Sequence, residues 1–583
     1  MEKENNKGQS FIKGTMILAS SIVVVKILGI FFRIFVTGMI GPSGAGYFTI
    51  AYEIYNTLFA LATAGLPIAL SRTVSENLAQ GRYRDVRNVH KVSVPVFTMA
   101  GSIGFFLMIL LAFFVPNMLN TPGAFYSVIA LAPTMLFACL MSIYRGYNQG
   151  FRNMIPTAVS EIIEAVCKFF LGYIISYNII KYGMHEFEIK GTFFGTIYDS
   201  KSLVEAAIMP FASAGAILGI SIGALFGFLY LFIRFKIKGD GITKEELKLA
   251  PRSKSKKFIF RKILKTAIPI GIGSIILNVA GLIDTTLILS RIQSIMNSNP
   301  APLLSYYGGR ITSEVINSKD GVHNFLLGCY SFTLPITMLI PAITQTFGVV
   351  SLPRVTAAWT IKDNKKLKKS INSVLKMTTL ITIPSGIGLA LIGNNLMRLI
   401  YPNRPLAVSI ASGILPIVAI AYIFVATATP VCSMLQAVGR ADLPVKIISI
   451  GLLLKIVVNY CLVGIPEINI QGAGIGTMVG YSFILAVGLF CLCRETKIIP
   501  NFKIIIIKPL IASIFCAITA YVASEFLGRF LHLAFTMGLS IFLAVIVYII
   551  SLLALHCVSR EDIIMIPGGK KFLKLLEKLN IVV

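Results

Sequence analysis

Apolar runs long enough to cross a lipid bilayer recur along the whole chain. Each holds about 20 or more residues, the length that a transmembrane helix needs. Hydrophobic side chains make up 56% of the 583 residues and charged ones 13%, about half of the ~25% typical of a soluble domain. A water-soluble fold cannot bury this much apolar surface. We therefore predict an all-α polytopic membrane protein with fourteen transmembrane helices, at residues 14–38, 47–70, 92–115, 124–147, 156–179, 205–233, 264–290, 322–350, 371–400, 406–435, 444–464, 471–493, 505–527 and 533–557.

Basic residues are distributed unevenly among the loops between these runs. With the N-terminus placed in the cytoplasm, 39 of the 53 Lys and Arg residues fall in cytoplasmic segments and 9 in segments on the opposite side. This asymmetry follows the positive-inside rule and predicts that both chain ends are cytoplasmic. It also accounts for the net charge of +28, so no nucleic-acid partner is needed. We expect the basic stretch from Lys254 to Lys262 to lie on anionic lipid headgroups.

Sequence motifs for catalysis, nucleotide binding or metal binding are absent. The nine Cys residues form no CxxC pair and have no His at ligand spacing, so we expect them to be small buried side chains. The chain has no GxxxxGK[ST] loop, no HExxH and no GxSxG with triad spacing. The sequence therefore predicts a protein that is not an enzyme and that holds no cofactor and no metal.

A faint internal repeat divides the chain into similar halves. The segment Arg152–Pro156 matches Arg440–Pro444 at an offset of 288, and Gly65–Arg72 matches Gly348–Arg354 at an offset of 282. An even number of helices per half makes the halves parallel repeats, an arrangement in which transporters place the substrate site between the halves. We predict an N-terminal lobe at 1–235, a basic cytoplasmic linker at 236–263, a C-terminal lobe at 264–493, two extra helices at 494–557 and a cytoplasmic amphipathic tail at 558–583.

Two cations lie within the first apolar run. Lys26 and Arg33 are seven residues apart, which is two helical turns, so both side chains lie on one face of a helix. Gly29 between them leaves room beside the backbone. Since a charge near the bilayer centre costs at least ~2.5 kcal/mol, each cation needs a partner, water or a substrate. This face suits an anionic substrate, because Arg binds phosphate oxygens bidentately. The alternatives are an ion pair between helices and a Lys26 side chain that reaches the membrane surface.

Acidic residues inside the apolar runs have several possible roles. Asp284 lies near the repeat equivalent of Arg33, so it is expected to pair with Arg33 in one state of a cycle, to bind Na⁺ or H⁺, or to serve packing alone. Glu53, near the outer end of its run, lines the substrate site or is solvated at the interface.

Two lone lysines occupy equivalent places in the two halves. Lys168 follows Pro156 by twelve residues, and Lys455 follows Pro444 by eleven. Both are candidate substrate-binding residues. Alternatively, Glu161 and Glu164 meet Lys168 about one helical turn later in a structural ion pair.

Several short motifs recur along the chain in a characteristic order. They are Phe11–Leu18, Lys26–Gly29 with Arg33, Gly41–Tyr47, Ala64–Ser71, and Tyr144–Gly150 followed by Pro156, Ser160 and Glu164. These motifs resemble the stage V sporulation protein B family, which belongs to the polysaccharide-exporter branch of the multidrug/oligosaccharidyl-lipid/polysaccharide (MOP) exporter superfamily. The MurJ-type lipid II flippases belong to the same superfamily. The resemblance covers nearly the whole chain.

The resemblance implies two six-helix lobes in a V with an alternating-access cavity, and two extra helices that form a groove for a lipid tail. It implies a lipid-linked oligosaccharide as cargo, an undecaprenyl-diphosphate-linked cell-wall precursor such as lipid II, in the bacterial cytoplasmic membrane. Lys26 and Arg33 match cavity arginines of MurJ-type relatives, although Lys26 replaces the usual Arg and Asn148 replaces an aromatic residue. Motif residues with expected gating roles are Gly65, Pro67, Arg72, Arg145, Gln149, Glu161 and Glu164.

Three other functions remain open at the level of sequence. One is a cation-coupled multidrug exporter of the same superfamily, which would need a mainly acidic or apolar cavity. Another is a non-transporting membrane scaffold for cell-wall or spore-cortex assembly. The third is a polyprenyl-phosphate sugar transferase, which would need an acidic metal-binding loop that the sequence lacks. For the flippase we expect a monomer among membrane lipids, driven by the membrane potential or by Na⁺ or H⁺.

Overall fold

The computed structural model describes residues 11–63, 65–318 and 320–557, and nearly all of them are helical. The predicted all-α class is confirmed. The predicted tail at 558–583 lies outside the described residues. By its internal contacts the chain forms two compact units. Unit 1 comprises the described part of Met1–Met296 together with Ile311–Phe332, and unit 2 comprises Asn297–Arg310 and the described part of Thr333–Val583. The predicted lobe limits of 1–235 and 264–493 stay a prediction.

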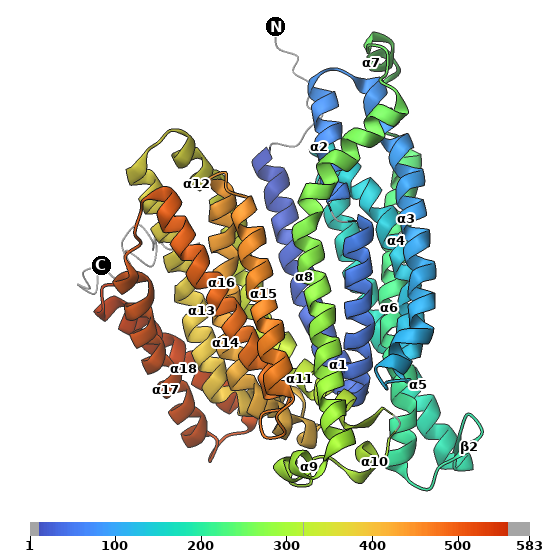
Figure 1. Ribbon diagram of the computed structural model, residues 1–583, viewed down its shortest axis with the longest axis vertical. Helices are drawn as coiled ribbons and strands as arrows, with labels where there is room; N and C mark the ends of the chain where they lie inside the picture. Colours follow the sequence, from blue (N-terminus) through green and yellow to red (C-terminus); the bar gives the residue numbers. More distant parts are fainter. Residues whose placement is uncertain (1–10, 64, 319, 558–583) are drawn as a thin grey trace. The chain divides into compact units, whose positions relative to one another are not determined.

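Among the described residues, unit 1 holds nine long or short helices, a small hairpin and the first part of α11. Figure 1 shows α5 and α6 running together toward the hairpin, with α7 at the opposite end of the unit. The elements are α1 (Phe11–Thr63), α2 (Leu66–Ala79), α3 (Tyr83–Met118), α4 (Ala124–Gly150), α5 (Ile155–Lys190), β1 (Thr192–Phe193), β2 (Thr196–Ile197), α6 (Lys201–Lys238), α7 (Lys244–Leu249), α8 (Lys256–Ser298), α10 (Ser313–Ile316) and α11 (Gly321–Thr337).

Unit 2 contains the remaining helices. A π-helical turn at Lys503–Ile507 precedes α17, and its Ile505 carbonyl accepts a hydrogen bond from Thr379 of α13 at 2.6 Å. The elements are α9 (Ala301–Tyr307), the end of α11, α12 (Leu339–Thr360), α13 (Asn364–Ile400), α14 (Pro405–Ala437), α15 (Asp442–Val463), α16 (Gln471–Thr496), α17 (Lys508–Leu527) and α18 (Leu533–Ala554).

The described residues contain 11 helices long and apolar enough to span a membrane, or up to 12 if the bent pair α11 and α12 counts as one span. The predicted count of fourteen is therefore not confirmed. The runs 14–38 and 47–70 merge because α1 continues through a kink at Gly41, whose φ of 68° favours glycine. The run 322–350 is broken between Thr337 and Leu339. The 36-residue α5 is not among the 11.

The kink in α1 is held by the start of α11, which packs on it backbone to backbone. A side chain on Gly46 would overlap Asn324, and one on Gly328 would overlap the Pro42 carbonyl. The Tyr47 hydroxyl donates to Asp320 at 2.6 Å. The small residues around the kink therefore serve close packing of α11, which explains why Ile311–Phe332 belongs to unit 1.

Glycines on α6 bring α5 into backbone contact. Gly215, Gly219, Gly223 and Gly227 recur every four residues and so lie on one face of α6. A Cβ on Gly219 would overlap the backbone of Gly172 in α5, and one on Gly223 would lie 2.7 Å from the Glu164 carbonyl. Small residues at such spacing let transmembrane helices approach closely. We call this contact between the α6 glycines and α5 the glycine seam. It fixes the position of Lys168 along the helix axis, because the Lys168 backbone nitrogen lies beside Gly223.

Two helix-to-helix corners have the same geometry in both units. Between α2 and α3 the left-handed residue is Gly81, and between α12 and α13 it is Lys362, an offset of 281. Between α4 and α5 it is Arg152, and between α14 and α15 it is Gly439, an offset of 287. In each corner the N–H of the left-handed residue donates to the carbonyl three residues earlier in the chain. The N–H of the next residue donates to the carbonyl five residues earlier.

These corners support the predicted repeat and correct its register by one residue in each case. The offset of 287 also places Lys455 at the equivalent of Lys168. Gly480 of α16 packs on Lys455 as Gly223 of α6 packs on Lys168. The two lone lysines therefore occupy equivalent environments next to a glycine of the following helix.

Candidate functional site

Arg33 of α1 and Lys168 of α5 each lie over aromatic rings. The Arg33 Cζ is 5.9 Å from the centre of the Phe48 ring, and the Lys168 Nζ is 4.9 Å from that of Phe32 and 5.9 Å from that of Tyr52. Both cationic residues are half-buried. Within the described chain neither forms an ion pair or a hydrogen bond through its side chain. Ring faces stabilise a cation but leave its charge uncompensated.

Three aromatic residues of α1 build this cation site. Phe48 and Tyr52 are one turn apart, and their rings stack at 5.7 Å. Phe32 is buried, and its ring approaches Gly172, where a Cβ would lie 2.8 Å from the Phe32 Cε2 atom. Since Gly172 is one turn after Lys168, the missing side chain lets Phe32 reach under the lysine. We call Phe32, Arg33, Phe48, Tyr52 and Lys168 the cation–aromatic cluster.

The face of α1 that carries Arg33 is open beside Gly29. No heavy atom of the described residues lies within 4 Å of a Cβ built there. The expected room between Lys26 and Arg33 is thus present. Lys26 is half-buried, which is consistent with its predicted place on the same face. The alternative of an interhelical ion pair is wrong for Arg33 among the described residues.

The acidic residues of α5 have other partners than the expected Lys168. Glu164 accepts a hydrogen bond from Arg145 of α4 at 2.8 Å, and the same guanidinium donates to the Ser160 hydroxyl at 3.0 Å. Glu161 accepts from Ser21 of α1 at 3.5 Å. The predicted pairing of Glu161 and Glu164 with Lys168 is therefore wrong. Glu164 binds Arg145 because the planar guanidinium can donate to the Glu164 carboxylate and to the Ser160 hydroxyl at the same time.

Glu53 lies at a contact between α1 and α8, and Asp284 lies on α8. The Asp284 side chain is buried. Glu53 rests against the backbone of α8, where a Cβ on Gly281 would be 2.7 Å from its Oε2 atom. Asp284 does not pair with Arg33, whose guanidinium lies over the Phe48 ring. Whether Glu53 lines the substrate site or is solvated at the interface stays a prediction.

The remaining motif residues lie near the corners of unit 1. Gly65, with φ of 73°, turns the chain between α1 and α2 and touches the Ala267 carbonyl of α8. Pro67 packs on Gly146 of α4, where a Cβ would lie 2.8 Å from the Pro67 carbonyl oxygen. The carbonyl of Gln149 accepts the N–H of Arg152 in the α4–α5 corner. These residues shape the scaffold around the cluster.

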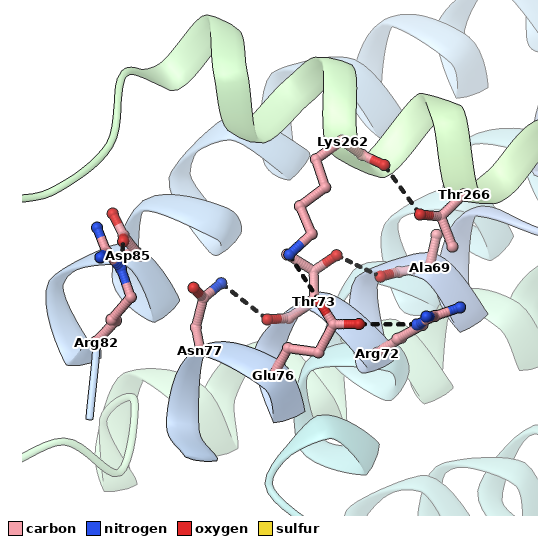
Figure 2. Close-up of polar contacts among 9 residues, drawn as sticks. All are labelled: Ala69, Arg72, Thr73, Glu76, Asn77, Arg82, Asp85, Lys262 and Thr266. Carbon is pink, nitrogen blue, oxygen red and sulfur yellow. Dashed lines mark hydrogen bonds and ion pairs between the residues drawn. The ribbon is translucent and has the colours of Figure 1, made fainter. Parts of the chain in front are cut away.

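Arg72 is exposed, and its guanidinium binds Glu76. Figure 2 shows the Arg72 guanidinium and the Lys262 amine on either side of the Glu76 carboxylate, at 2.8 Å and 2.6 Å. Sequence reasoning found Arg72 but missed both of its neighbours in this bridge. It also missed Phe32, Phe48 and Tyr52, for which the four-residue aromatic spacing in α1 was the available signal.

Two family descriptions match parts of the chain. Residues 11–182 match the family described as Polysaccharide biosynthesis protein, and residues 321–461 match MatE. Stage V sporulation protein B of Bacillus subtilis is 23% identical over 96% of this chain and 98% of its own length. Lipid II flippase MurJ of the same organism is 22% identical over 87% of this chain and 86% of its own length.

Solved structures of transporters share the fold. An inward-facing MATE family multidrug transporter of the MOP superfamily gives a TM-score of 0.62 at 13% identity, covering 83% of this chain and 98% of that one. The chain therefore shares the fold of this MOP-superfamily transporter. The inward closed structure of lipid II flippase MurJ gives a TM-score of 0.55 at 17% identity, covering 92% and 98%. These proteins are named as a transporter and a flippase.

Proposed function

We propose that this protein, which shares the fold of MOP-superfamily transporters, is a flippase for a saccharide linked to a polyprenyl diphosphate, such as the cell-wall precursor lipid II. The observation that carries the proposal is the cation–aromatic cluster. Arg33 and Lys168 keep two positive charges within a membrane-spanning unit without a carboxylate to neutralise them. A cluster that serves only packing gains nothing from uncompensated charge, whereas a diphosphate supplies the missing negative charge.

The chemistry of the cluster fits a diphosphate bound to a lipid. The Arg33 guanidinium offers paired N–H donors to phosphate oxygens, and the Lys168 ammonium adds a point charge. The open space beside Gly29 leaves room for a headgroup next to both Arg33 and Lys26. In this proposal the saccharide crosses by alternating access while the lipid tail remains in the bilayer.

The driving force is part of the proposal. An inside-negative membrane potential favours outward movement of a dianionic headgroup, at about 2.3 kcal/mol per charge per 100 mV. Return of the emptied, cationic site can use the same potential or a counter-ion, Na⁺ or H⁺, at an acid such as Asp284. Lys455, the repeat equivalent of Lys168, is the corresponding candidate in unit 2.

A cation-coupled multidrug exporter is the second candidate, favoured by the TM-score of 0.62 with a MATE family transporter. A cationic drug next to Arg33 and Lys168 would meet like charge, which disfavours this cargo. A membrane scaffold without transport is the third possibility, and it predicts that loss of these charges leaves flipping of any lipid unaffected.

Headgroup translocation in proteoliposomes tests the proposal. Fluorescent lipid II is reconstituted with the purified protein, and the accessible headgroup is followed by quenching. We expect flipping by the parent protein and at least tenfold slower flipping by the R33Q/K168M double variant. Arg234→Gln, which removes a cation at the end of α6, is the matched control and should flip at the parental rate. Equal rates for parent and double variant, or uptake of organic cations without flipping, would overturn the proposal.

A further inference from the structure

The linker between α6 and α8 carries exposed cations that no carboxylate neutralises. Arg252, Lys254, Lys256, Lys257 and Arg261 are all exposed, and we call these five residues the linker patch. In the part of the chain that the structure describes, none of their side chains forms an ion pair. Lys256, Lys257 and Arg261 lie in the first turns of α8, which continues without a break into its apolar part. The patch therefore lies next to a membrane-spanning segment.

Acidic residues near the patch are used to hold the linker in place. Asp85 is buried, pairs with Arg82 at 2.6 Å, and accepts the backbone N–H of Lys254 at 2.7 Å. Asp240 pairs with Arg87 of α3 at 2.5 Å. These carboxylates fix the main chain of the linker onto α3 but leave the Lys254 ammonium without a carboxylate partner. The linker is therefore docked with its cationic side chains facing outward.

An ion-pair bridge centred on Glu76 holds the start of α8 against α2. Glu76 of α2 binds Lys262 at 2.6 Å and Arg72 at 2.8 Å, as Figure 2 shows. Lys262, one residue after the patch, is thus turned inward, whereas Arg261 remains exposed. The two neighbouring cations have different roles because only one of them can reach a carboxylate.

Aromatic side chains accompany the patch on the outer side of α8. Phe258 is 50% exposed and Phe260 37%, whereas Ile259 and Ile263 are buried against unit 1. The Lys254 Nζ lies 5.0 Å from the centre of the Phe258 ring. Aromatic rings beside cations at the end of a spanning helix are typical of the interface between lipid headgroups and acyl chains.

We infer that the linker patch binds the headgroups of anionic phospholipids in the surrounding membrane. Phosphodiester headgroups complement the five charges, and the acyl region below them accommodates Phe258 and Phe260. Juxtamembrane clusters of four to eight Lys and Arg residues bind anionic lipid surfaces, with about fivefold tighter binding per cation. The inference does not depend on the cargo, because the linker patch and the cation–aromatic cluster share no residue.

Site-specific fluorescence quenching in the full-length protein tests this inference. Trp359 is the single tryptophan, so a W359F/F258W variant reports from the patch alone. The variant is reconstituted in nanodiscs of phosphatidylcholine mixed with phosphatidylglycerol, and bromine is placed on one lipid or the other. We expect brominated phosphatidylglycerol to quench more strongly than its share of the lipid predicts. High salt should reduce this preference, because the charges are exposed.

Two triple variants separate the patch from overall charge. K254Q/K256Q/K257Q removes three of the five cations and should lower the binding constant for phosphatidylglycerol at the patch by roughly a hundredfold. The preferential quenching by brominated phosphatidylglycerol should therefore be lost. K181Q/K190Q/K201Q removes the same charge at the far ends of α5 and α6 and should keep the preference. Equal quenching by the two lipids, an unchanged preference in the first triple variant, or displacement of the lipid by short RNA at physiological salt would overturn the inference. If K254Q/K256Q/K257Q does not fold, the inference is tested by the comparison of the two brominated lipids and by the salt titration, both with the W359F/F258W variant.

Discussion

Replacing Lys168 with Met should make the cargo-free protein more stable while it slows transport. An uncompensated charge in a membrane-spanning helix costs ~2.5–3.5 kcal/mol near the bilayer centre. Contacts with the rings of Phe32 and Tyr52, at 4.9 Å and 5.9 Å, return about 0.5–2 kcal/mol. Because Lys168 is half-buried, we expect a net gain of about 1–2 kcal/mol on replacement with an apolar side chain of similar length.

Arg145→Met is the matched control, because Arg145 is a cation of the same unit that does have a carboxylate partner. Its side chain is 21% exposed and binds Glu164 at 2.8 Å. Removing one member of a fully buried pair costs about 3–5 kcal/mol. Partial exposure of this pair reduces the expected loss to about 1–3 kcal/mol. The two variants remove the same charge and should change stability in opposite directions.

Thermal unfolding in detergent measures the difference, with exposure of the buried thiols of Cys139 and Cys329 to a maleimide dye as the signal. Lys168→Met should unfold at a higher temperature than the parent, and Arg145→Met at a lower one. Lys168→Met should at the same time slow flipping about tenfold or more, because a charged hydrogen bond to phosphate contributes about 1.5–3 kcal/mol. Destabilisation by Lys168→Met would mean that the lysine serves packing and would refute the reasoning.

Three further variants test the fold and the open face. Gly219→Ala should destabilise by about 1–3 kcal/mol, measured by the same unfolding assay, because its Cβ would overlap Gly172; a stability equal to the parent's would contradict the α5–α6 seam. Gly29→Leu should fold normally but stop headgroup flipping, since the new side chain fills the open space beside α1; normal flipping would show that no headgroup passes there. Tyr47→Phe should lower stability by about 1.5–3 kcal/mol through loss of its hydrogen bond to Asp320, and an unchanged unfolding temperature would argue against this contact.

The helical class and the repeat were predictable from the sequence because each depends on long segments. Runs of about 20 apolar residues have few alternatives to membrane helices. The Arg152 and Arg440 segments showed the repeat, although the offset of 288 missed the structural value of 287 by one residue. Helix interruptions were harder to place. The break after Thr337 interrupts an apolar run whose composition does not change there.

The candidate site was predicted only in part, because its contacts join helices that are distant in sequence. Spacing along one helix brings Glu164 close to Lys168, and this local rule favoured an ion pair. Arg145 from α4 takes Glu164 instead, which leaves Lys168 to the rings of α1. The spacing of residues along one helix cannot predict that a side chain from another helix takes the ion-pair partner. The open space beside Gly29, in contrast, agrees with the room that the sequence of α1 predicts.

The glycine seam between α5 and α6 limits how unit 1 can move. Where main chains touch at Gly172 and Gly219, a slide of one or two residues would force a side chain into space that backbone atoms occupy. The next register without such overlap is four residues away, about 6 Å along the axis. Gradual gliding of these two helices past each other is therefore blocked. Any approach of the Lys168 ammonium to a bound molecule must come from rotation about its own side-chain bonds or from motion of both helices as one piece.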